Sequence, residues 1–129
     1  MELMNIINNS KLQPQNMTIE ELFHIILFEL GFSFSLLGTQ YLEELFSLAY
    51  NKYENTCDIK ITDLYQDLAR LHDTSVNAIS RAIRYSITVA WDKGNTRLQN
   101  ELFGYTVDPE RGKPTLLEFL CLVMELLKL

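Results

Sequence analysis

Between Thr18 and the end of the chain, several segments have hydrophobic residues every three or four positions, which is the spacing of amphipathic α-helices, and residues 105–113, with Pro109 and Gly112, are predicted to form a loop. Thr18 and Glu21 fit an N-terminal capping box, whose hydroxyl and carboxylate bind amides that the first turn leaves free. Gly31 is a typical helix stop, since glycine readily adopts the left-handed conformation found there. The first helix is therefore predicted between Thr18 and Gly31, with an apolar side made of Leu22, Ile25, Ile26 and Leu30.

Five more helices are predicted from the same periodicity. The second covers about residues 37–53, and the fifth covers 96–103 and ends before a glycine. A second capping box, at Thr115 and Glu118, opens the last helix. No alternating run is long enough to require a strand, and only residues 105–107 are a candidate for locally extended chain. The predicted fold class is all-α, with about six helices.

The third and fourth helices lie close together in the sequence. Thr62 is expected to open the third, whose pattern breaks at His72 and Asp73. Thr74 is expected to cap the fourth, which runs to about Lys93. Two helices joined by so short a turn indicate a helix-turn-helix.

The chain is long enough for one domain with its own apolar core, because it has 129 residues, of which 47% are hydrophobic. Residues 1–17 show little periodicity and are predicted to form a flexible N-terminal arm, with residues 18–129 as the domain. No stretch approaches the roughly 18 apolar residues of a membrane span, and the N-terminus lacks the basic start of a signal peptide. We therefore expect a cytoplasmic protein without a membrane partner.

The residue types that carry catalysis or bind metals show no productive spacing. Cys57 and Cys121 belong to no metal-binding pattern and are expected to be reduced thiols. His24 and His72 lack a second ligand at suitable spacing, and the sequence contains no glycine-rich phosphate loop or Ser/His/Asp set. The sequence thus predicts neither an enzyme nor a metal or cofactor site.

The net charge of −6 argues at first against a polyanionic partner, but the charges are unevenly distributed. Residues 1–55 contain seven acidic and two basic residues, and residues 101–129 contain five and three. Residues 56–100 contain six basic and five acidic residues, which gives a net charge of +1. The predicted helix-turn-helix therefore lies in the most basic part of an acidic chain.

The predicted fourth helix has two well-separated sides. At 100° per residue, four polar side chains fall within a sector of about 60°, opposite a side rich in isoleucine and alanine; they are Asn77, Arg81, Arg84 and Thr88. Arginine binds guanine O6 and N7 with two parallel hydrogen bonds, and a helix fits the major groove. The alternative is that these arginines are solvated surface charges, paired locally with Asp63, Asp67, Asp73 or Asp92. The pattern alone leaves both interpretations open.

Several blocks of sequence resemble one known family. Residues 79–95 read ISRAIRYSITVAWDKGN, residues 102–107 read LFGYTV, and Lys113-Pro114-Thr115 is followed by Glu118-Phe119. At this mutual spacing the blocks are similar to the C-terminal effector domain of stage-zero sporulation protein A. The similarity extends more weakly toward residue 18, and so covers nearly the whole chain.

The resemblance implies a six-helix, DNA-binding transcription regulator whose fourth helix lies in the major groove of double-stranded DNA. It assigns base reading to Arg81 and DNA contact to Arg84, and it makes RNA polymerase a further candidate partner. Asn77 and Thr88 are expected at base edges or phosphates, and Ser80 and Tyr85 are candidates on the same helix. Weaker candidates for backbone contact are Lys60, Arg70, Lys93 and Arg97.

The chain also departs from the family's pattern. Where family members carry an arginine and a glutamate that help to read bases, this chain has Ala78 and Ser80, so its target sequence is expected to differ. A lysine of the family is replaced by Thr62, which removes a backbone anchor. Family members carry a phosphoacceptor receiver domain before this domain, whereas only about 17 residues stand there in this sequence; the chain is either an excised fragment or a stand-alone protein, and the initial Met1 favours the expectation of a stand-alone protein.

The last helix is apolar on almost every side, with Glu118 and Glu125 as the exceptions. Such a helix either packs in the core or meets another chain, which makes self-association the alternative. The same alternative leads to a second function, that of a protein-interaction module or decoy that kept the fold and lost DNA reading. The acidic charge, Ala78 and Ser80 favour that second function.

Overall fold

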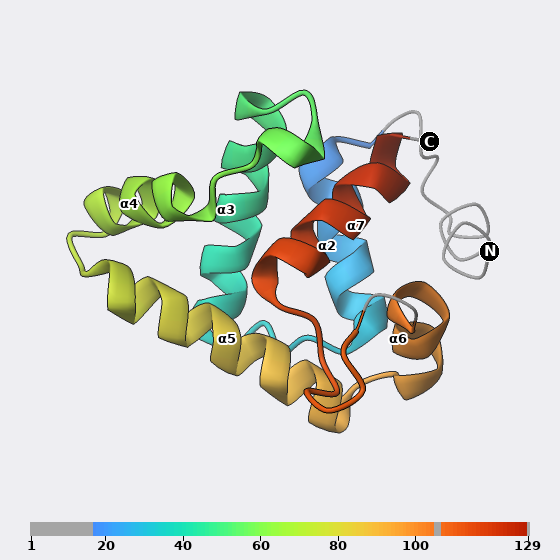
Figure 1. The fold of residues 1–129 in the computed structure, drawn as a ribbon. Coiled ribbons are helices and arrows are strands. Elements are labelled where there is room, and N and C mark those ends of the chain that lie inside the picture. The colour runs from blue at the N-terminus through green and yellow to red at the C-terminus, as the bar shows by residue number, and fades with distance from the viewer. Residues whose placement is uncertain (1–16, 105–106, 129) are drawn as a thin grey trace.

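The computed structural model describes residues 17–104 and 107–128, which form six α-helices and one short 3-10 helix and contain no strand (Figure 1). The helices are α2 (Ile19–Leu30), α3 (Leu37–Lys52), η2 (Thr56–Asp58), α4 (Ile61–Leu71), α5 (Val76–Lys93), α6 (Thr96–Phe103) and α7 (Leu116–Lys128). The all-α prediction is confirmed. Most of the predicted arm, residues 1–16, lies outside the described residues, as do residues 105 and 106 of the predicted extended stretch.

Both predicted capping boxes open a helix. The Thr18 hydroxyl accepts a hydrogen bond from the Glu21 amide at 3.1 Å, and α2 ends at Gly31, whose φ is 97°. At α7 the exchange is reciprocal: the Thr115 amide donates to the Glu118 carboxylate at 2.8 Å, and the Glu118 amide donates to the Thr115 hydroxyl at 3.2 Å. These bonds satisfy amides that lack partners within the helix, and so they fix where each helix begins.

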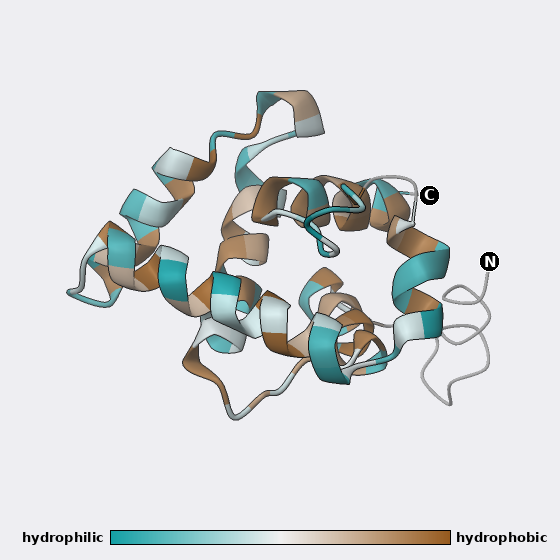
Figure 2. Cartoon of the chain, turned by 60° about the horizontal axis from the view of Figure 1, so that its bottom comes forward, coloured by the Kyte–Doolittle hydropathy of each residue, from teal (hydrophilic) through white to brown (hydrophobic). Residues whose placement is uncertain are grey.

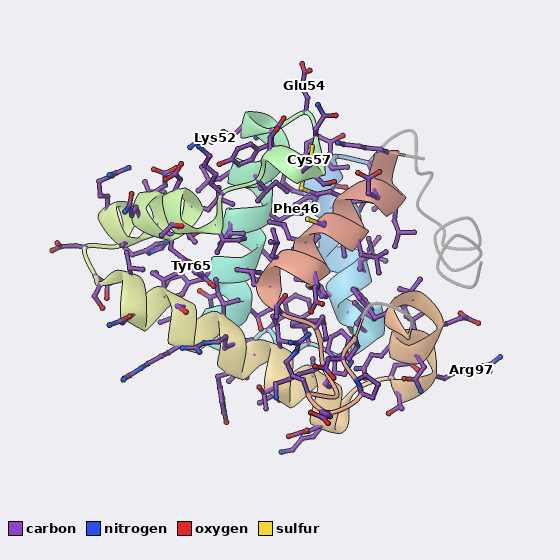
Figure 3. All side chains as sticks on the ribbon, in the orientation of Figure 1. Phe46, Lys52, Glu54, Cys57, Tyr65 and Arg97 are labelled. Atoms are coloured by element: carbon purple, nitrogen blue, oxygen red, sulfur yellow. The ribbon has the colours of Figure 1, made fainter. Side chains whose placement is uncertain are left out.

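The core is built from the apolar sides of all six helices, with aromatic rings at its centre. Phe23 of α2 and Phe46 of α3 stack with centroids 3.9 Å apart, and Phe46 points inward from α3 (Figure 3). Phe119 of α7 contacts four further rings, those of Phe23, Phe32, Trp91 and Phe103. Figure 2 shows hydrophilic residues interrupting hydrophobic ones along the helices, as expected where each helix buries one side.

Helix α7 belongs to this core. Six of its side chains are buried, namely Leu116, Phe119, Leu120, Val123, Met124 and Leu126. The interpretation of the last helix as a core helix is thereby confirmed. Of its large apolar residues, Leu117 is the one that remains distinctly exposed, at 42%.

Helices α4 and α5 follow each other in the chain and are joined by a four-residue turn (Figure 1). The Thr74 amide donates to the Ala69 carbonyl at 3.0 Å, and the Asp73 amide donates to the Arg70 carbonyl at 3.4 Å. This pair of bonds is the Schellman motif, and it holds Asp73 in the left-handed region at a φ of 51°. The motif and the length of the turn fit the predicted helix-turn-helix.

Two predicted helix starts are shifted by one residue. The cap of α5 is Ser75, whose hydroxyl accepts from the Ala78 amide at 3.0 Å, and not Thr74. The reason is that Thr74 is already used in the motif that ends α4. Helix α4 begins at Ile61 rather than Thr62, because Lys60 occupies the cap position without a side-chain bond.

Helix α5 is held against α3 by close backbone approach. A Cβ added to Gly38 of α3 would lie 1.9 Å from the Ala82 carbonyl oxygen of α5 and 2.4 Å from the Ser86 hydroxyl oxygen. Only glycine permits this separation. The buried residues of α5 are Ile79, Ile83, Ser86, Ile87 and Ala90. Because these residues face the core, the residues on the opposite side of α5 face outward.

Candidate nucleic-acid interface

The outer side of α5 presents two exposed arginines. Arg81 and Arg84 are exposed, and neither forms an ion pair within residues 17–104 and 107–128. Because they are three residues apart on one helix, their side chains leave from the same side. None of Asp63, Asp67, Asp73 and Asp92 pairs with either one, so the local neutralisation considered from the sequence is not found.

Asn77 and Thr88 lie on the same side of α5 as the two arginines, one on each side of that pair along the helix. Together the four residues form a polar stripe along α5. Asn77 is exposed in the first turn, where the reading residues of recognition helices cluster. Thr88 is half-buried, and its hydroxyl donates to the Arg84 carbonyl at 2.9 Å. Because the hydrogen of that hydroxyl is used within the helix, the Thr88 side chain can only accept a hydrogen bond from another molecule. The Asn77 side chain can both donate and accept.

Ser80 is turned toward α4 and contacts Tyr65. Burial raises the pKa of Tyr65, while a hydrogen bond with the Ser80 side chain and the positive charge of Arg84 offset part of that rise. Ser80 is half-buried and lies near Tyr65 of α4. Tyr65 lies on α4 on the side that faces α5 (Figure 3). Tyr65 is not among the site residues that the sequence analysis proposed.

Tyr85 follows Arg84 and is 60% exposed, which is unusual for so large an aromatic side chain. Together with Arg81, Arg84 and Thr88 it lines a hollow of about 630 Å³. The hollow lies between the start of α4, the middle of α5 and the segment that leads into α7. We call it the α4–α5–α7 hollow.

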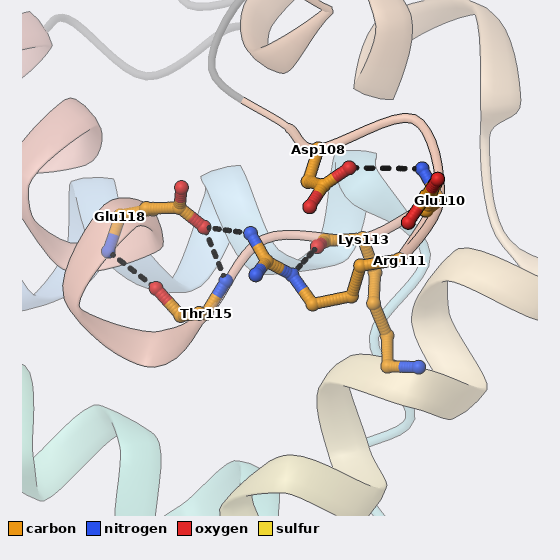
Figure 4. A network of polar contacts seen from close by, with 6 residues as sticks. All are labelled: Asp108, Glu110, Arg111, Lys113, Thr115 and Glu118. Atoms are coloured by element: carbon orange, nitrogen blue, oxygen red, sulfur yellow. Dashed lines mark hydrogen bonds and ion pairs between the residues drawn. The ribbon is translucent and has the colours of Figure 1, made fainter.

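Two basic residues that the sequence analysis missed line the same hollow. Arg111 and Lys113 precede α7 and belong to a segment whose overall charge is negative, which concealed them. Arg111 is fixed by hydrogen bonds from its Nε to the Lys113 carbonyl at 2.9 Å and from its guanidinium to Glu118 at 2.7 Å (Figure 4). The Lys113 side chain extends away from this network (Figure 4). The sequence feature that could have pointed to these two residues is their position directly before the predicted capping box at Thr115.

The four weaker candidates are spread widely over the molecule. Lys60 caps α4 and Lys93 ends α5, and both are exposed. Arg70 is bound to Asp67 on its own helix, and Lys52 lies 3.8 Å from the same carboxylate. Arg97 projects from α6 on the far side of the molecule from α4 (Figure 3). None of these four lines the hollow, and Lys60 directly precedes Ile61, which does.

Comparison with known proteins identifies the chain's relatives. Residues 23–127 match the family described as sporulation initiation factor Spo0A C terminal, and this range includes α3 to α6 complete, most of α2 and nearly all of α7. The chain belongs to this family. The resemblance noted in the sequence is thereby confirmed over almost its whole length.

Within this Spo0A C-terminal domain, the described residues contain no other group with evident chemistry. They include no cluster of three or more His, Cys, Asp and Glu that would hold a metal ion. His24 and His72 instead bind Glu43 and Glu44 of α3, the former at 2.8 Å. Among the described helices, none combines the length and the apolar character needed to cross a membrane.

The two cysteines of the Spo0A C-terminal domain are free, as expected from the sequence. They lie nearer to each other than their separation in the sequence suggests, because η2 packs on α7. The Cys121 thiol donates to the Thr56 carbonyl at 3.8 Å, directly beside Cys57. Burial raises the pKa of Cys121, and the charges of Glu125 and Cys57 raise it further.

Proposed function

We propose that this chain is a transcription regulator that binds double-stranded DNA with α5 in the major groove. The observation that carries the proposal is the exposure of Arg81 and Arg84 on one side of α5, without an ion pair in the described part of the chain. Membership of a family of sporulation effector domains supports it. So does the short Schellman turn between α4 and α5, which fits a helix-turn-helix.

The roles along α5 follow from side-chain chemistry and position. Arg81 lies in the second turn, where a guanidinium in the groove can bind guanine with two hydrogen bonds. Arg84 contacts DNA one turn further on, and Asn77 and Thr88 meet base edges or phosphates. The helix rises about 1.5 Å per residue, so the stripe from Asn77 to Thr88 extends roughly 17 Å. That length suits a few consecutive base pairs of one groove.

Contacts to the sugar-phosphate backbone fall to basic residues outside the stripe. Lys60 and Lys93 are exposed and occupy the start of α4 and the end of α5. Arg70 is already engaged with Asp67, and Arg97 is far from α4, so we rank both lower. Neutralised phosphates release counterions, and affinity should fall steeply with salt in a protein whose net charge is −6.

A selection from a pool of random duplexes tests the proposal. Arg81→Ala should lose sequence preference at one or two base pairs, at a cost of ~1–3 kcal/mol per lost base contact. Lys93→Ala is the matched control, and it should weaken all sequences alike without changing the selected motif. If Arg81→Ala and the wild type select the same sequence with the same affinity, the assignment of base reading to Arg81 is wrong.

The proposal includes the finer expectations from the sequence. Residues 18–129 act as the DNA-binding domain behind an arm formed by residues 1–17, in the cytoplasm. RNA polymerase is a candidate partner once the domain is on DNA. Self-association through α7 has less surface available, because six of its side chains are buried in the same chain.

A second candidate function is a protein-interaction module or decoy that has lost DNA reading. It is favoured by Ala78, and by Ser80 being directed at Tyr65 rather than outward. The decisive outcome would be no duplex binding at about 50 mM salt together with a stable complex with a receiver-bearing relative. Duplex binding that depends on Arg81 would exclude it.

A further inference from the structure

The α4–α5–α7 hollow has the size of a small-molecule site. Its volume of about 630 Å³ falls within the ~300–1,000 Å³ that is usual for ligand pockets. Three separate parts of the chain form its walls: the start of α4, the middle of α5, and the segment from Arg111 to Leu117. The first two belong to consecutive helices, whose connection is held by the hydrogen bond from the Thr74 amide to the Ala69 carbonyl.

Most of the inner surface of the hollow is apolar. Its apolar walls comprise Ile61, Tyr65, Tyr85, Ile87, Pro114, Leu116 and Leu117. Tyr85 and Leu117 come from different elements and are 60% and 42% exposed, although both are large hydrophobic residues. Exposed apolar residues gathered at a concave surface indicate a binding site, whereas single ones scattered over a surface do not.

The charged residues at the hollow are all basic. Arg81 and Arg84 come from α5, and Arg111 and Lys113 come from the segment before α7. Among the described residues that line the hollow, none is acidic. Arg111 shares its charge with Glu118, while Lys113 forms no ion pair within residues 17–104 and 107–128. An occupant that matches these walls is apolar in its body and anionic at one end.

We propose that the α4–α5–α7 hollow binds a small amphipathic anion, with an aromatic or aliphatic body and a carboxylate, sulfonate or phosphate group. The body covers Tyr85 and Leu117, and the anionic group lies between the α5 arginines and Lys113. A nucleic-acid phosphate alone would leave the apolar walls uncovered. Since the ligand uses Arg81 and Arg84, it excludes duplex DNA from α5, and this last step rests on the proposed DNA-binding function.

Binding is tested directly with anilinonaphthalene sulfonate, which combines an aromatic body with one anionic group and fluoresces when its surroundings become apolar. The wild type should bind one probe molecule saturably. Its uncharged parent, phenylnaphthylamine, should bind about tenfold more weakly, because it gains nothing from the arginines. Equal affinity for the charged and uncharged probes would overturn the proposal, as would binding that does not saturate.

Variants place the probe in the hollow. Leu117→Glu and Lys113→Glu should each raise the dissociation constant about tenfold or more, since the first puts a carboxylate against the apolar body of the ligand and the second puts one beside its anionic group. Leu71→Glu is the matched control: Leu71 is 68% exposed and does not line the hollow, so this variant should bind as the wild type does. Unfolding curves show whether each variant is folded. Because two different positions are changed, the test still holds if one of the two variants does not fold.

Alternative occupants give different results. One outcome is that the wild type dimerises, that Leu117→Glu abolishes the dimer, and that the probe binds the wild type and the variant equally. In that case the hollow is a contact between copies of the chain, and the proposal is wrong. If the probe binds in the hollow but no duplex is bound, the DNA-binding function fails while the ligand site remains. If both bind, a saturating duplex should displace the probe, and simultaneous binding would overturn the exclusion.

Discussion

The side-chain amide of Gln99 donates to the main-chain carbonyl of Leu30 at 2.9 Å, although the two residues are separated by most of the domain. The same amide donates to the Ala90 carbonyl at 2.7 Å. Leu30 and Ala90 lie in the last turns of α2 and α5, and their carbonyls also accept from the backbone amides of Asn95 and Gly94, respectively. One buried side chain on α6 therefore ties together the ends of two other helices.

Replacing Gln99 should be costly because two buried carbonyls would lose a partner. Gln99→Met keeps the length of the side chain and should lower the free energy of unfolding by ~1–3 kcal/mol. Asn100→Ala, at an exposed position of the same helix, is the control and should change it by less than about 0.5 kcal/mol. Urea denaturation of both variants measures the difference, and equal midpoints would mean that the Gln99 bonds contribute nothing net.

Gly38 should tolerate no side chain. In Gly38→Ala the new Cβ would meet the Ala82 carbonyl oxygen, so α3 and α5 must move apart, and overpacking of this kind costs ~1–3 kcal/mol or more. Gly112→Ala is the comparison, because a Cβ there meets nothing within 4 Å and only its positive φ is strained. Its loss should be about 1 kcal/mol. Thermal unfolding that ranks Gly112→Ala as the more damaging variant would contradict this account of the α3–α5 contact.

Two serines of α5 should respond in opposite ways to the same substitution. Ser86 is fully buried, and its hydroxyl has no hydrogen-bond partner among the described residues, so Ser86→Ala should leave stability unchanged or raise it by about 1 kcal/mol. Ser75 caps the helix, so Ser75→Ala should lower stability by ~1 kcal/mol. Calorimetric melting of the pair decides it, and a clear loss for Ser86→Ala would mean that its hydroxyl has an unseen partner.

Stability should also fall in alkaline solution because of Cys121. Its folded-state pKa is raised above the ordinary value of 9.0, mainly by burial, so the folded protein holds this proton more tightly than the unfolded chain does. The resulting stability is complete below about pH 9 and is lost as the pH rises through the folded pKa. Cys121→Ser keeps a donor for the Thr56 carbonyl and should show a smaller decline. Urea midpoints across this pH range compare the two proteins, and parallel curves would count against the effect.

Helix ends could be predicted wherever the signal is local. Thr18, Gly31 and the Thr115–Glu118 pair act within four residues of the ends that they set, so the sequence is sufficient to find them. The cap of α5 was wrongly assigned to Thr74, since the sequence offers two hydroxyl residues in a row. Only the hydrogen bond from Thr74 to Ala69 shows that the first of them belongs to the preceding helix.

Contacts between distant segments could not be predicted. The helical pattern placed Arg81 and Arg84 on one side of α5, but nothing in it indicated that Arg111 and Lys113 would line the same hollow. The role of Gly38 was likewise hidden, because a glycine within a helical pattern carries no record of what approaches it. Such features depend on how complete helices pack, which local periodicity does not encode.

Helix α5 packs in the interior on one side and carries the residues proposed to read DNA on the other, since Ile79 and Ile83 are buried while Arg81 and Arg84 face outward. Because a helix is stiff, a rotation of α5 about its axis moves its buried side and its exposed side together. Substitutions at the isoleucines would thus re-aim the guanidinium groups without touching them. Under the proposed function, interior mutations can therefore alter operator preference, and a search for specificity variants that is confined to the surface would overlook them.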